Sequence, residues 1–476
     1  MSDKKVFVNN LVNIPNTYPI YKVTAERLLE LLPRDLRELA EHLPQVQLIG
    51  ADDYFIHYSI TPLLRDKNPD KVLDKALRFQ REYMGTDKYK RVRILTTLDD
   101  ELSTIHAVSL TKFILEKIKE EAEKQLDEMR RQQQSQQQQQ QGGSCGCNLP
   151  SSLGDLVNQA SQGNKQAQAM LKQILRNAVN NVLNKNANKT LSEAHEKAKK
   201  QTESAEKIIS MLPSRQAGKE PGVFEKIIDL SEHIMKVADA DKIVSYAEQL
   251  IESLPRFTHI KKKAGRIGDE LRGYTTTKKV ERALPRELAL PDELFYMKLV
   301  GNGLLSREKL IVMEGSLYVI VDKSGSMGGH KLVWSRSVAL ALYKFALRKK
   351  RKYFLRFFDT QVYPDYPITD PLDALEHILK IPASGGTSID TALRTAVAEI
   401  SSKGLSQYTN TIILITDGED RVKTRPELLT SNNIVLVAVM IDGHNMTLRR
   451  LAEKTKGQYM RVEPDRKGAL RIIQVI

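Results

Sequence analysis

Oxygen-bearing side chains follow an apolar segment in the C-terminal part of this chain. The apolar run Leu317–Val321 is followed directly by Asp322, and then by Ser324 and Ser326 around a glycine. A buried strand with this ending presents one carboxylate and two hydroxyls at the C-terminal edge of a sheet, where open α/β sheets bind their ligands. Hard divalent cations prefer oxygen ligands. The pattern therefore predicts a cation site at a strand end.

Two further oxygen donors stand at comparable places downstream. Thr387 ends a Ser-Gly-Gly-Thr loop just before a predicted helix, and Asp417 comes shortly after the apolar run Thr411–Ile415. In a parallel sheet these segments converge on the edge that carries Asp322. Two carboxylates and three hydroxyls suit Mg²⁺ or Mn²⁺ with water completing the shell, and no thiolate or imidazole set indicates zinc.

The low charge of this ligand set would leave the ion electrophilic. An open coordination position would then accept a carboxylate from outside the chain. The simpler interpretation is that Asp322 and the two serines only cap a helix. It does not account for Thr387 and Asp417 at matching strand ends.

The elements that would position these residues alternate between strand and helix from about residue 316 onward. The strands are continuous apolar runs, which is typical of a parallel sheet covered on both faces. We therefore expect residues 316–476 to form one doubly wound, Rossmann-like α/β domain. Beyond Leu317–Val321, strands are expected at Tyr353–Phe358, Thr411–Thr416, Ile434–Ile441 and Gln458–Val462, and helices at Leu332–Leu347, Pro371–Leu379, Ile389–Ile400 and Met446–Thr455.

The N-terminal half has the periodicity of helices. Nine of the ten residues at 132–141 are glutamine, and Gly-Gly-Ser follows, so residues 132–149 are expected to be a flexible linker or a frayed helix extension. Residues 1–131 are predicted to be a mostly helical domain, with Val92–Leu98 a short strand or a loop. Residues 150–256 are predicted to be a helical bundle. Residues 257–315 are expected to be a basic connector. Its part from Lys261 to Arg286, which includes Lys261–Lys263, is expected to be loop-like, and either solvated or a contact for phosphate or an acidic protein.

Bulk properties limit the class of protein. The chain has 476 residues and a formal net charge of +14, which favours acidic partners, nucleic acid among them. The only cysteines, Cys145 and Cys147, exclude a disulfide framework and argue for a reducing compartment. The N-terminus lacks a signal-peptide core, and no run of 18 apolar residues predicts a membrane span. We therefore expect a cytoplasmic protein.

Other candidate residues have simpler interpretations. Cys145 and Cys147 cannot complete a tetrahedral zinc site, and a linker thiol pair without function is favoured over an intermolecular site. His330 fits a surface position at a helix start better than a ligand contact or a base. Arg348–Lys352 reads as a solvated turn, or else as a contact for an acidic partner or nucleic acid. No phosphate-binding Gly-x-x-x-x-Gly-Lys-Ser/Thr loop occurs.

The motif Asp322-x-Ser324-x-Ser326, with Thr387 and Asp417, resembles the metal-ion-dependent adhesion site (MIDAS) of von Willebrand factor A (VWA) domains. The resemblance runs from Ser316 to the C-terminus. It implies that both serines and Thr387 bind the metal directly, whereas both aspartates bind directly or through water. Ser388 is a departure, because relatives often carry aspartate after the threonine.

The segments Gly273–Tyr274 and Val280–Leu290, with the predicted helices from Phe224 to Leu254, are similar to the region preceding the VWA domain in ViaA- and CoxE-type proteins. Those proteins work with MoxR-type AAA+ ATPases. The resemblance implies a non-enzymatic, chaperone-like adaptor whose Mg²⁺ takes an Asp or Glu of such an ATPase.

Two other classes stay open. Ro ribonucleoproteins also join helical repeats to a VWA domain, and the charge of +14 favours such an RNA-binding protein. No clear helical repeat period supports it. A hydrolase that uses the bound metal is disfavoured, because no nucleophile–base pair is evident.

Overall fold

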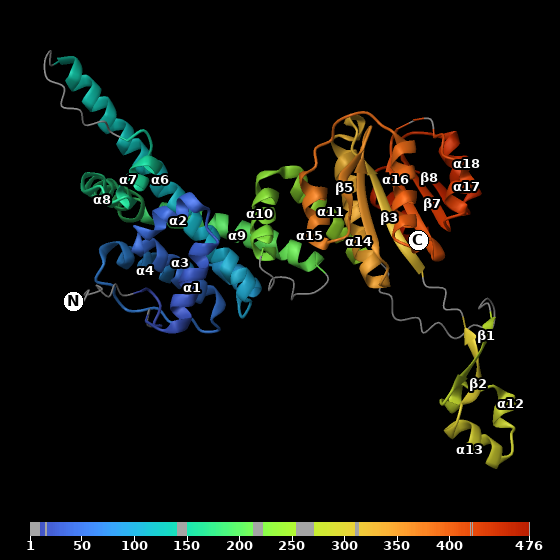
Figure 1. Ribbon diagram of the computed structural model, residues 1–476. Helices are drawn as coiled ribbons and strands as arrows, with labels where there is room; N and C mark the ends of the chain where they lie inside the picture. Colours follow the sequence, from blue (N-terminus) through green and yellow to red (C-terminus); the bar gives the residue numbers. More distant parts are fainter. Residues whose placement is uncertain are drawn as a thin grey trace. The chain divides into compact units, whose positions relative to one another are not determined.

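A computed structural model describes residues 10–14, 17–139, 150–212, 222–253, 271–309, 314–418, 420 and 422–475 (Figure 1). The chain divides into two compact units, Met1–Asp241 and Lys242–Ile476. Among the described residues, no helix is both long enough and apolar enough to cross a bilayer.

The first unit is helical, as its periodicity predicts. Side-chain caps start several of its helices, for example Asp70, which accepts hydrogen bonds from the backbone N–H groups of Val72 and Leu73. The helices are α1 (Pro19–Glu30), α2 (Arg34–Glu41), α3 (Pro44–Tyr58), α4 (Lys71–Met84), α5 (Asp87–Thr96), α6 (Asp100–Gln139), α7 (Leu153–Ser161), α8 (Lys165–Val179), the π-helix η1 (Asn180–Lys185), α9 (Ala187–Met211) and α10 (Val223–Lys236).

One hydrophobic core runs through this unit, with buried side chains from Leu11 to Ala198. Residues on both sides of the glutamine tract therefore share a core, although the sequence suggested a domain boundary there. Helix α6 continues through the tract to Gln139, so this part of the tract is a helix extension. The prediction of a strand or loop at Val92–Leu98 was wrong, because α5 covers most of that segment and Thr86 caps its first turn.

The second unit contains the predicted α/β domain, and helix α11 (Ala238–Ser253) leads into it. Its sheet has the order β5-β4-β3-β6-β7-β8, in which all neighbours are parallel except β5, which is antiparallel to β4. The strands are β3 (Glu314–Asp322), β4 (Tyr353–Phe358), β5 (Val362–Ile368), β6 (Thr409–Thr416), β7 (Ile434–Ile441) and β8 (Gln458–Val462). The sequence missed only the antiparallel edge strand β5 among them.

Helices cover both faces of this sheet. One core cluster joins Tyr318 and Ile320 of β3 to side chains of α16 and α18. Helix α14 packs against β3 and β4, and also contacts α15 and α19. The helices are α14 (His330–Lys349), α15 (Pro371–Lys380), α16 (Ile389–Ser402), α17 (Pro426–Thr430), α18 (Met446–Lys454) and α19 (Arg466–Val475). The doubly wound α/β prediction is confirmed.

The region between the helices and the sheet is more ordered than a connector. Strands β1 (Leu271–Thr277) and β2 (Leu304–Lys309) pair antiparallel, and between them lie α12 (Pro285–Leu288) and α13 (Asp292–Val300). The prediction of a loop from Lys261 to Arg286 was therefore wrong from Leu271 onward. The basic run Lys261–Lys263 and the pair Cys145 and Cys147 lie outside the described residues.

Candidate metal centre

Strands β3 and β6 are neighbours in the sheet, and their carboxyl ends form its topological switch point. The chain leaves β3 through α14 for β4 on one side, whereas it leaves β6 for β7 on the other. Open α/β sheets bind ligands in the crevice that such a reversal creates. Asp322 is the last residue of β3, and Asp417 follows the last residue of β6. The topology therefore places both predicted carboxylates at this crevice.

The side-chain oxygens at this point are spaced like neighbouring ligands of one small cation. Ser324 Oγ lies 3.1 Å from Ser326 Oγ, and Ser326 Oγ lies 2.8 Å from Asp417 Oδ1. Adjacent oxygens of an octahedral Mg²⁺ shell, with bonds of about 2.0–2.1 Å, are about 2.9 Å apart. The donor set thus fits a hard divalent ion in both chemistry and spacing.

Asp322 forms the base of the site. One carboxylate oxygen accepts the backbone N–H of Ser324 at 2.8 Å, and the other accepts the hydroxyl of Thr416. Burial raises the pKa of Asp322, while these hydrogen bonds act in the opposite direction. Each carboxylate oxygen keeps a second lone pair for a metal or a metal-bound water.

The Thr387 loop is tied to the Asp322 loop by its backbone. Gly325 N–H donates to Gly385 C=O at 3.1 Å, and Ser384 N–H donates to Lys323 C=O at 2.7 Å. A Cβ placed on Gly418 would lie 2.8 Å from Thr387 Cγ2, so the Thr387 side chain lies against the turn that carries Asp417. The structure therefore brings all five predicted residues to one edge of the sheet.

A buried ion pair beside the site joins the Asp322 loop to the end of β4. Lys323 Nζ lies 2.5 Å from Asp359 Oδ2, and both side chains are less than a tenth exposed. Burial alone would raise the pKa of Asp359, but the Lys323 ammonium and the Gln361 N–H outweigh it, so the pKa lies below its ordinary value. The backbone C=O of Asp359 also accepts Ser388 N–H at 2.7 Å. Sequence reasoning missed this pair, because a lysine between two predicted ligands gives no sign of being buried.

Lys331 is a second residue that the sequence analysis missed. Its ammonium lies 2.7 Å from Asp417 Oδ2 and 3.9 Å from Asp442 Oδ2. Because Asp417 Oδ1 faces Ser326, the two oxygens of this carboxylate serve different partners. Lys331 therefore fixes the orientation of Asp417 and reduces the negative charge of the site. His330, the residue before it, is exposed at the first position of α14.

Exposure increases across the site in one direction. Asp322 and Ser324 are each only 2% exposed, Thr387 and Asp417 are half-buried, and Ser326 is exposed. An ion held by these oxygens would be reached from the side of Ser326. This gradient leaves room for a ligand donated by another molecule.

Two other charged segments of the domain have structural partners. Asp390 accepts hydrogen bonds from Lys423 N–H and the Thr424 hydroxyl and forms an ion pair with Arg394, so these groups occupy its carboxylate. In the basic run Arg348–Lys352, Arg351 is buried and donates to Gly315 C=O at 2.9 Å. That run is therefore only partly a solvated turn.

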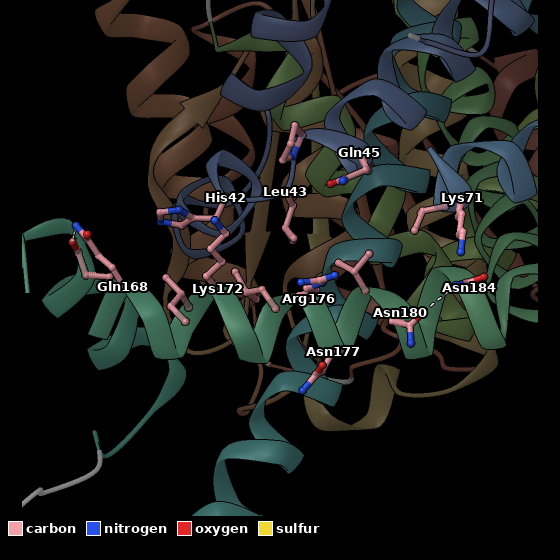
Figure 2. Close-up of a pocket in the computed structure, with 16 residues that line it drawn as sticks. His42, Leu43, Gln45, Lys71, Gln168, Lys172, Arg176, Asn177, Asn180 and Asn184 are labelled. Atoms are coloured by element: carbon pink, nitrogen blue, oxygen red, sulfur yellow. Dashed lines mark hydrogen bonds between the residues drawn. The ribbon is translucent and has the colours of Figure 1, made fainter. Parts of the chain in front are cut away.

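The helical unit has a separate hollow of about 870 Å³ between α8 and the start of α3 (Figure 2). Its lining includes the cations Lys71, Lys172 and Arg176, and amides of the π-helix such as Asn180. None of the lining residues in the described part of the chain is acidic. The chemistry of this hollow suits an anionic ligand.

Comparisons with known proteins assign the C-terminal unit. The family model of the von Willebrand factor type A domain matches residues 316–472. The uncharacterized protein MJ0811 of Methanocaldococcus jannaschii is 26% identical over 234 residues, which are 46% of this chain and 53% of that protein. The uncharacterized protein MJ0077 of the same organism is 32% identical over 111 residues, which are 23% of this chain and 26% of that protein. The chain thus spans about half or less of the length of these curated relatives.

One further relative and two solved structures are also similar to this chain. A putative VWFA domain-containing protein, ORF892, of Acidianus two-tailed virus is 26% identical over 34% of this chain and 19% of its own length. Among solved structures, an aerotolerance-related membrane protein from Bacteroides fragilis has a TM-score of 0.29 at 17% identity, covering 34% of this chain and 98% of its own. The SpRpn10 VWA domain has a TM-score of 0.28 at 11% identity, covering 34% of this chain and 94% of its own.

The assignment rests on the family model together with the observed strand order. Its match begins at Ser316 inside β3 and ends inside α19, so it takes in the sheet from β3 to β8 and all the oxygens of the site. Residues 316–472 of this chain are a von Willebrand factor type A domain.

Proposed function

We propose that the VWA domain is a metal-dependent docking module, in which Mg²⁺ is held by Ser324, Ser326 and Thr387 with Asp322 and Asp417. The observation that carries this proposal is the 3.1 Å and 2.8 Å spacing of the Ser324, Ser326 and Asp417 oxygens at the switch point. VWA domains commonly bind a divalent metal at this position. When bound, the ion would offer a coordination position to a carboxylate.

The chain's own residues support binding rather than catalysis. Lys331 and the hydroxyl ligands keep the site from being strongly negative, so an incoming Asp or Glu is attracted rather than repelled. The exposed side at Ser326 admits a side chain from another protein. We propose that the ligand is a carboxylate of a partner protein, and that the protein is not an enzyme.

The partner that we propose is a MoxR-type AAA+ ATPase, with the helical unit engaging the client or the ATPase ring in a chaperone-like machine. The support is the resemblance of the segment Val280–Leu290 to ViaA- and CoxE-type proteins. In the structure this segment lies between β1 and β2 and includes α12.

The experiment is capture of the MoxR-type ATPase of the same genome by the full chain in Mg²⁺ and in EDTA. Thr387→Ala removes one direct ligand, so Mg²⁺ affinity should fall roughly tenfold or more and capture should be lost. Thr395→Ala, at a half-buried position of α16 where the hydroxyl donates only to Thr391 C=O, is the matched control and should behave as wild type. Asp322→Ala should also lose capture while the domain stays folded. Capture that survives EDTA or Thr387→Ala would refute the metal bridge.

RNA binding is the second candidate, and one observation favours it. The hollow in the helical unit is lined by Lys71, Lys172 and Arg176 without an acidic residue among its described lining. RNA binding there should weaken steeply with salt and fall in Arg176→Ala but not in Thr387→Ala. No RNA retardation at low salt would exclude this candidate.

A further inference from the structure

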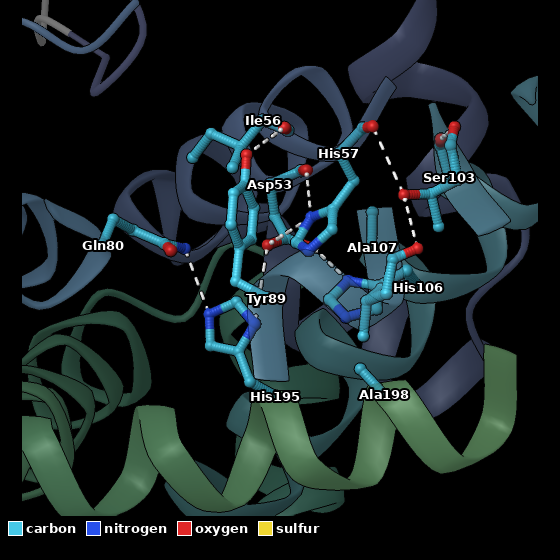
Figure 3. Close-up of polar contacts among 12 residues, drawn as sticks. Asp53, Ile56, His57, Gln80, Tyr89, Ser103, His106, Ala107, His195 and Ala198 are labelled. Atoms are coloured by element: carbon cyan, nitrogen blue, oxygen red, sulfur yellow. Dashed lines mark hydrogen bonds and ion pairs between the residues drawn. The ribbon is translucent and has the colours of Figure 1, made fainter. Parts of the chain in front are cut away.

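Four titratable side chains meet in the core of the helical unit, and none of them belongs to a predicted site. They are Asp53 and His57 of α3, His106 of α6 and His195 of α9 (Figure 3). All four are between 0% and 2% exposed. One ligand atom from each lies within 4.8 Å of one from each of the others. Such a set is rare in a protein core, because each buried polar group must find a partner.

The hydrogen bonds of two of these histidines fix their tautomers. His57 Nδ1 lies 3.0 Å from the backbone C=O of Asp53, which can only accept, so Nδ1 carries the proton. His106 Nδ1 lies 2.7 Å from Asp53 Oδ2 and donates to it in the same way. The Nε2 atoms of both rings then carry lone pairs. Neither has a hydrogen-bond partner among the residues that the structure describes. Metal-binding histidines characteristically use their other nitrogen in this manner.

The third histidine, His195, presents Nδ1 rather than Nε2 to the same cluster. His195 Nε2 lies 3.1 Å from the side-chain amide of Gln80, and Nδ1 lies 3.8 Å from Asp53 Oδ1. The amide O and N of Gln80 are interchangeable in shape, and its Oε1 is buried without a partner in the described chain. With Oε1 turned toward His195, Nε2–H donates to it, which leaves a lone pair on Nδ1.

Four buried atoms therefore have no hydrogen-bond partner within the described chain: Asp53 Oδ1, His57 Nε2, His106 Nε2 and His195 Nδ1. The three nitrogens are ligand atoms that a metal ion accepts, whereas Asp53 Oδ1 lies 3.3 Å from His57 Nδ1 and belongs to the carboxylate that accepts His106 Nδ1–H. A buried polar atom without a partner is unfavourable, and three imidazole nitrogens in one cluster call for a common partner.

We propose that His57, His106 and His195 bind one divalent transition-metal ion of the zinc or iron class, with Asp53 as the outer-shell carboxylate that accepts the Nδ1–H of His106. Three imidazoles are a donor set for such borderline ions, whereas Mg²⁺ and Ca²⁺ prefer all-oxygen shells. Tetrahedral bonds of about 2.0–2.1 Å place donors about 3.4 Å apart, so the cluster contracts slightly when the ion binds.

A route to the cluster exists on the side of His195. A pocket of about 260 Å³ is lined by His195, Tyr83, Phe79 and the carboxylate residues Glu82 and Glu196. The Tyr83 ring stacks on His195 with centroids 4.0 Å apart. Lys88 and Lys199 also line this pocket, and Lys88 pairs with Glu196 at 2.9 Å, so its charges balance. The aromatic wall holds the imidazole in place.

The ion would join segments that lie far apart in the sequence. Asp53 and His195 are separated by more than 140 residues, and α3, α6 and α9 form the centre of the unit. Binding would therefore stabilise the helical unit as a whole, because the unfolded chain has no preformed site. The role is structural, and it is independent of the VWA docking proposal.

The test begins with the purified full chain, which is incubated with Zn²⁺ and then dialysed extensively. Metal analysis should find about one zinc per chain, and Asp322→Ala should retain it because that variant removes only the VWA site. Cobalt substitution should give the intense visible absorption of a tetrahedral Co²⁺ centre. Hydrogen exchange in α3, α6 and α9 should slow when Zn²⁺ is present.

Variants then locate the site. His106→Gln and His195→Gln should each lose the zinc, whereas His42→Gln, at an exposed histidine of the same unit, should keep it. Gln80→Leu leaves the three histidine ligands in place and should weaken zinc binding about 10–100-fold through loss of the hydrogen bond to His195. This variant keeps the test decisive if the histidine variants do not fold.

Either of two results would overturn the proposal. The first is a wild-type chain that binds no zinc or cobalt after dialysis, which would make the cluster a purely polar core network. The second is full zinc occupancy in a folded His106→Gln or His195→Gln chain, which would place the metal elsewhere.

Discussion

Lys323→Met tests whether the buried ion pair beside the metal centre supports the VWA domain. Lys323 and Asp359 are 8% and 7% exposed, and their charged atoms are 2.5 Å apart. The Lys323 ammonium also lies 4.5 Å from the centre of the Tyr363 ring. Methionine keeps most of the aliphatic volume of lysine but leaves the Asp359 carboxylate buried without its cation.

The expected cost follows from that geometry. Removing one partner of a buried pair destabilises by about 3–5 kcal/mol, because the other charge loses its compensation. For a domain of this size the free energy of unfolding falls by about 2 kcal/mol per molar urea, so the urea concentration at the unfolding midpoint should fall by about 1.5–2.5 M. Adding Asp359→Asn to the Lys323→Met chain removes the unpaired carboxylate charge, so the double variant should regain about 2 kcal/mol of the lost stability.

The assay uses a property of the chain itself. Trp334 is the only tryptophan, is 1% exposed and lies in α14 of the VWA domain, so its fluorescence reports on that domain alone. Lys403→Met is the control, because this exposed lysine lies 5.3 Å from the Phe354 ring. It should change stability by less than about 1 kcal/mol.

A Lys323→Met chain within about 0.5 kcal/mol of wild type would refute the reasoning, since the pair would then contribute nothing net. The reasoning would be refuted equally if the double variant lost as much stability as Lys323→Met and Asp359→Asn lose together when measured singly.

Three other outcomes are expected. Glu232→Gln breaks a 2.7 Å contact with Lys112 between α10 and α6 and should cost about 1–3 kcal/mol at pH 7, measured by urea unfolding followed by circular dichroism. Burial raises the pKa of Glu232, but the lysine ammonium groups, Lys112 foremost, outweigh it and set the pKa below its ordinary value. The stabilisation by the Glu232 carboxylate is therefore fully present above about pH 4.3 and is lost as the pH falls through the folded-state pKa of Glu232. A difference in stability between wild type and Glu232→Gln that persists at pH 3 would contradict this. Gly50→Ala should lower the free energy of unfolding by about 1–3 kcal/mol in the same assay, because the added Cβ would lie 2.2 Å from Thr111 Oγ1. A second change, Thr111→Ala, should restore most of the lost stability, and the absence of such a rescue would contradict the clash. Removing Mg²⁺ with EDTA should lower the Trp334 unfolding midpoint in wild type but not in Thr387→Ala, and equal shifts in both would argue against the proposed ligand set.

Much of the VWA domain was predictable from sequence, because its strands are buried on both faces and read as uninterrupted apolar runs. Tyr353–Phe358, Ile434–Ile441 and Gln458–Val462 match the observed β4, β7 and β8 exactly. The edge strand β5 was missed, since its residues are mostly half-buried or exposed and give no such signal. The boundary expected at the glutamine tract failed for a different reason. Composition cannot show that helices on both sides of a tract share one core.

The two candidate sites differ in what sequence can reveal. Asp322, Ser324 and Ser326 are adjacent in the chain and follow a recognisable strand, so their convergence with Asp417 follows from parallel topology. The four residues of the buried cluster come from three helices, and only Asp53 and His57 are close in sequence. Their i, i+4 spacing is too common to indicate a ligand set. Packing of α3 against α6 and α9 creates that cluster, and single-sequence periodicity does not specify such packing.

The edge strand β5 also limits how other proteins can attach to this domain. An open sheet edge is ordinarily a template on which a foreign strand can polymerise. In β5, Pro364 and Pro367 have no backbone N–H, and Asp365 adds a charge between them. Strand addition at that side is therefore disfavoured, which reduces the tendency of the domain to aggregate through β5. It also favours partners that bind through side chains at the loop end over those that extend the sheet.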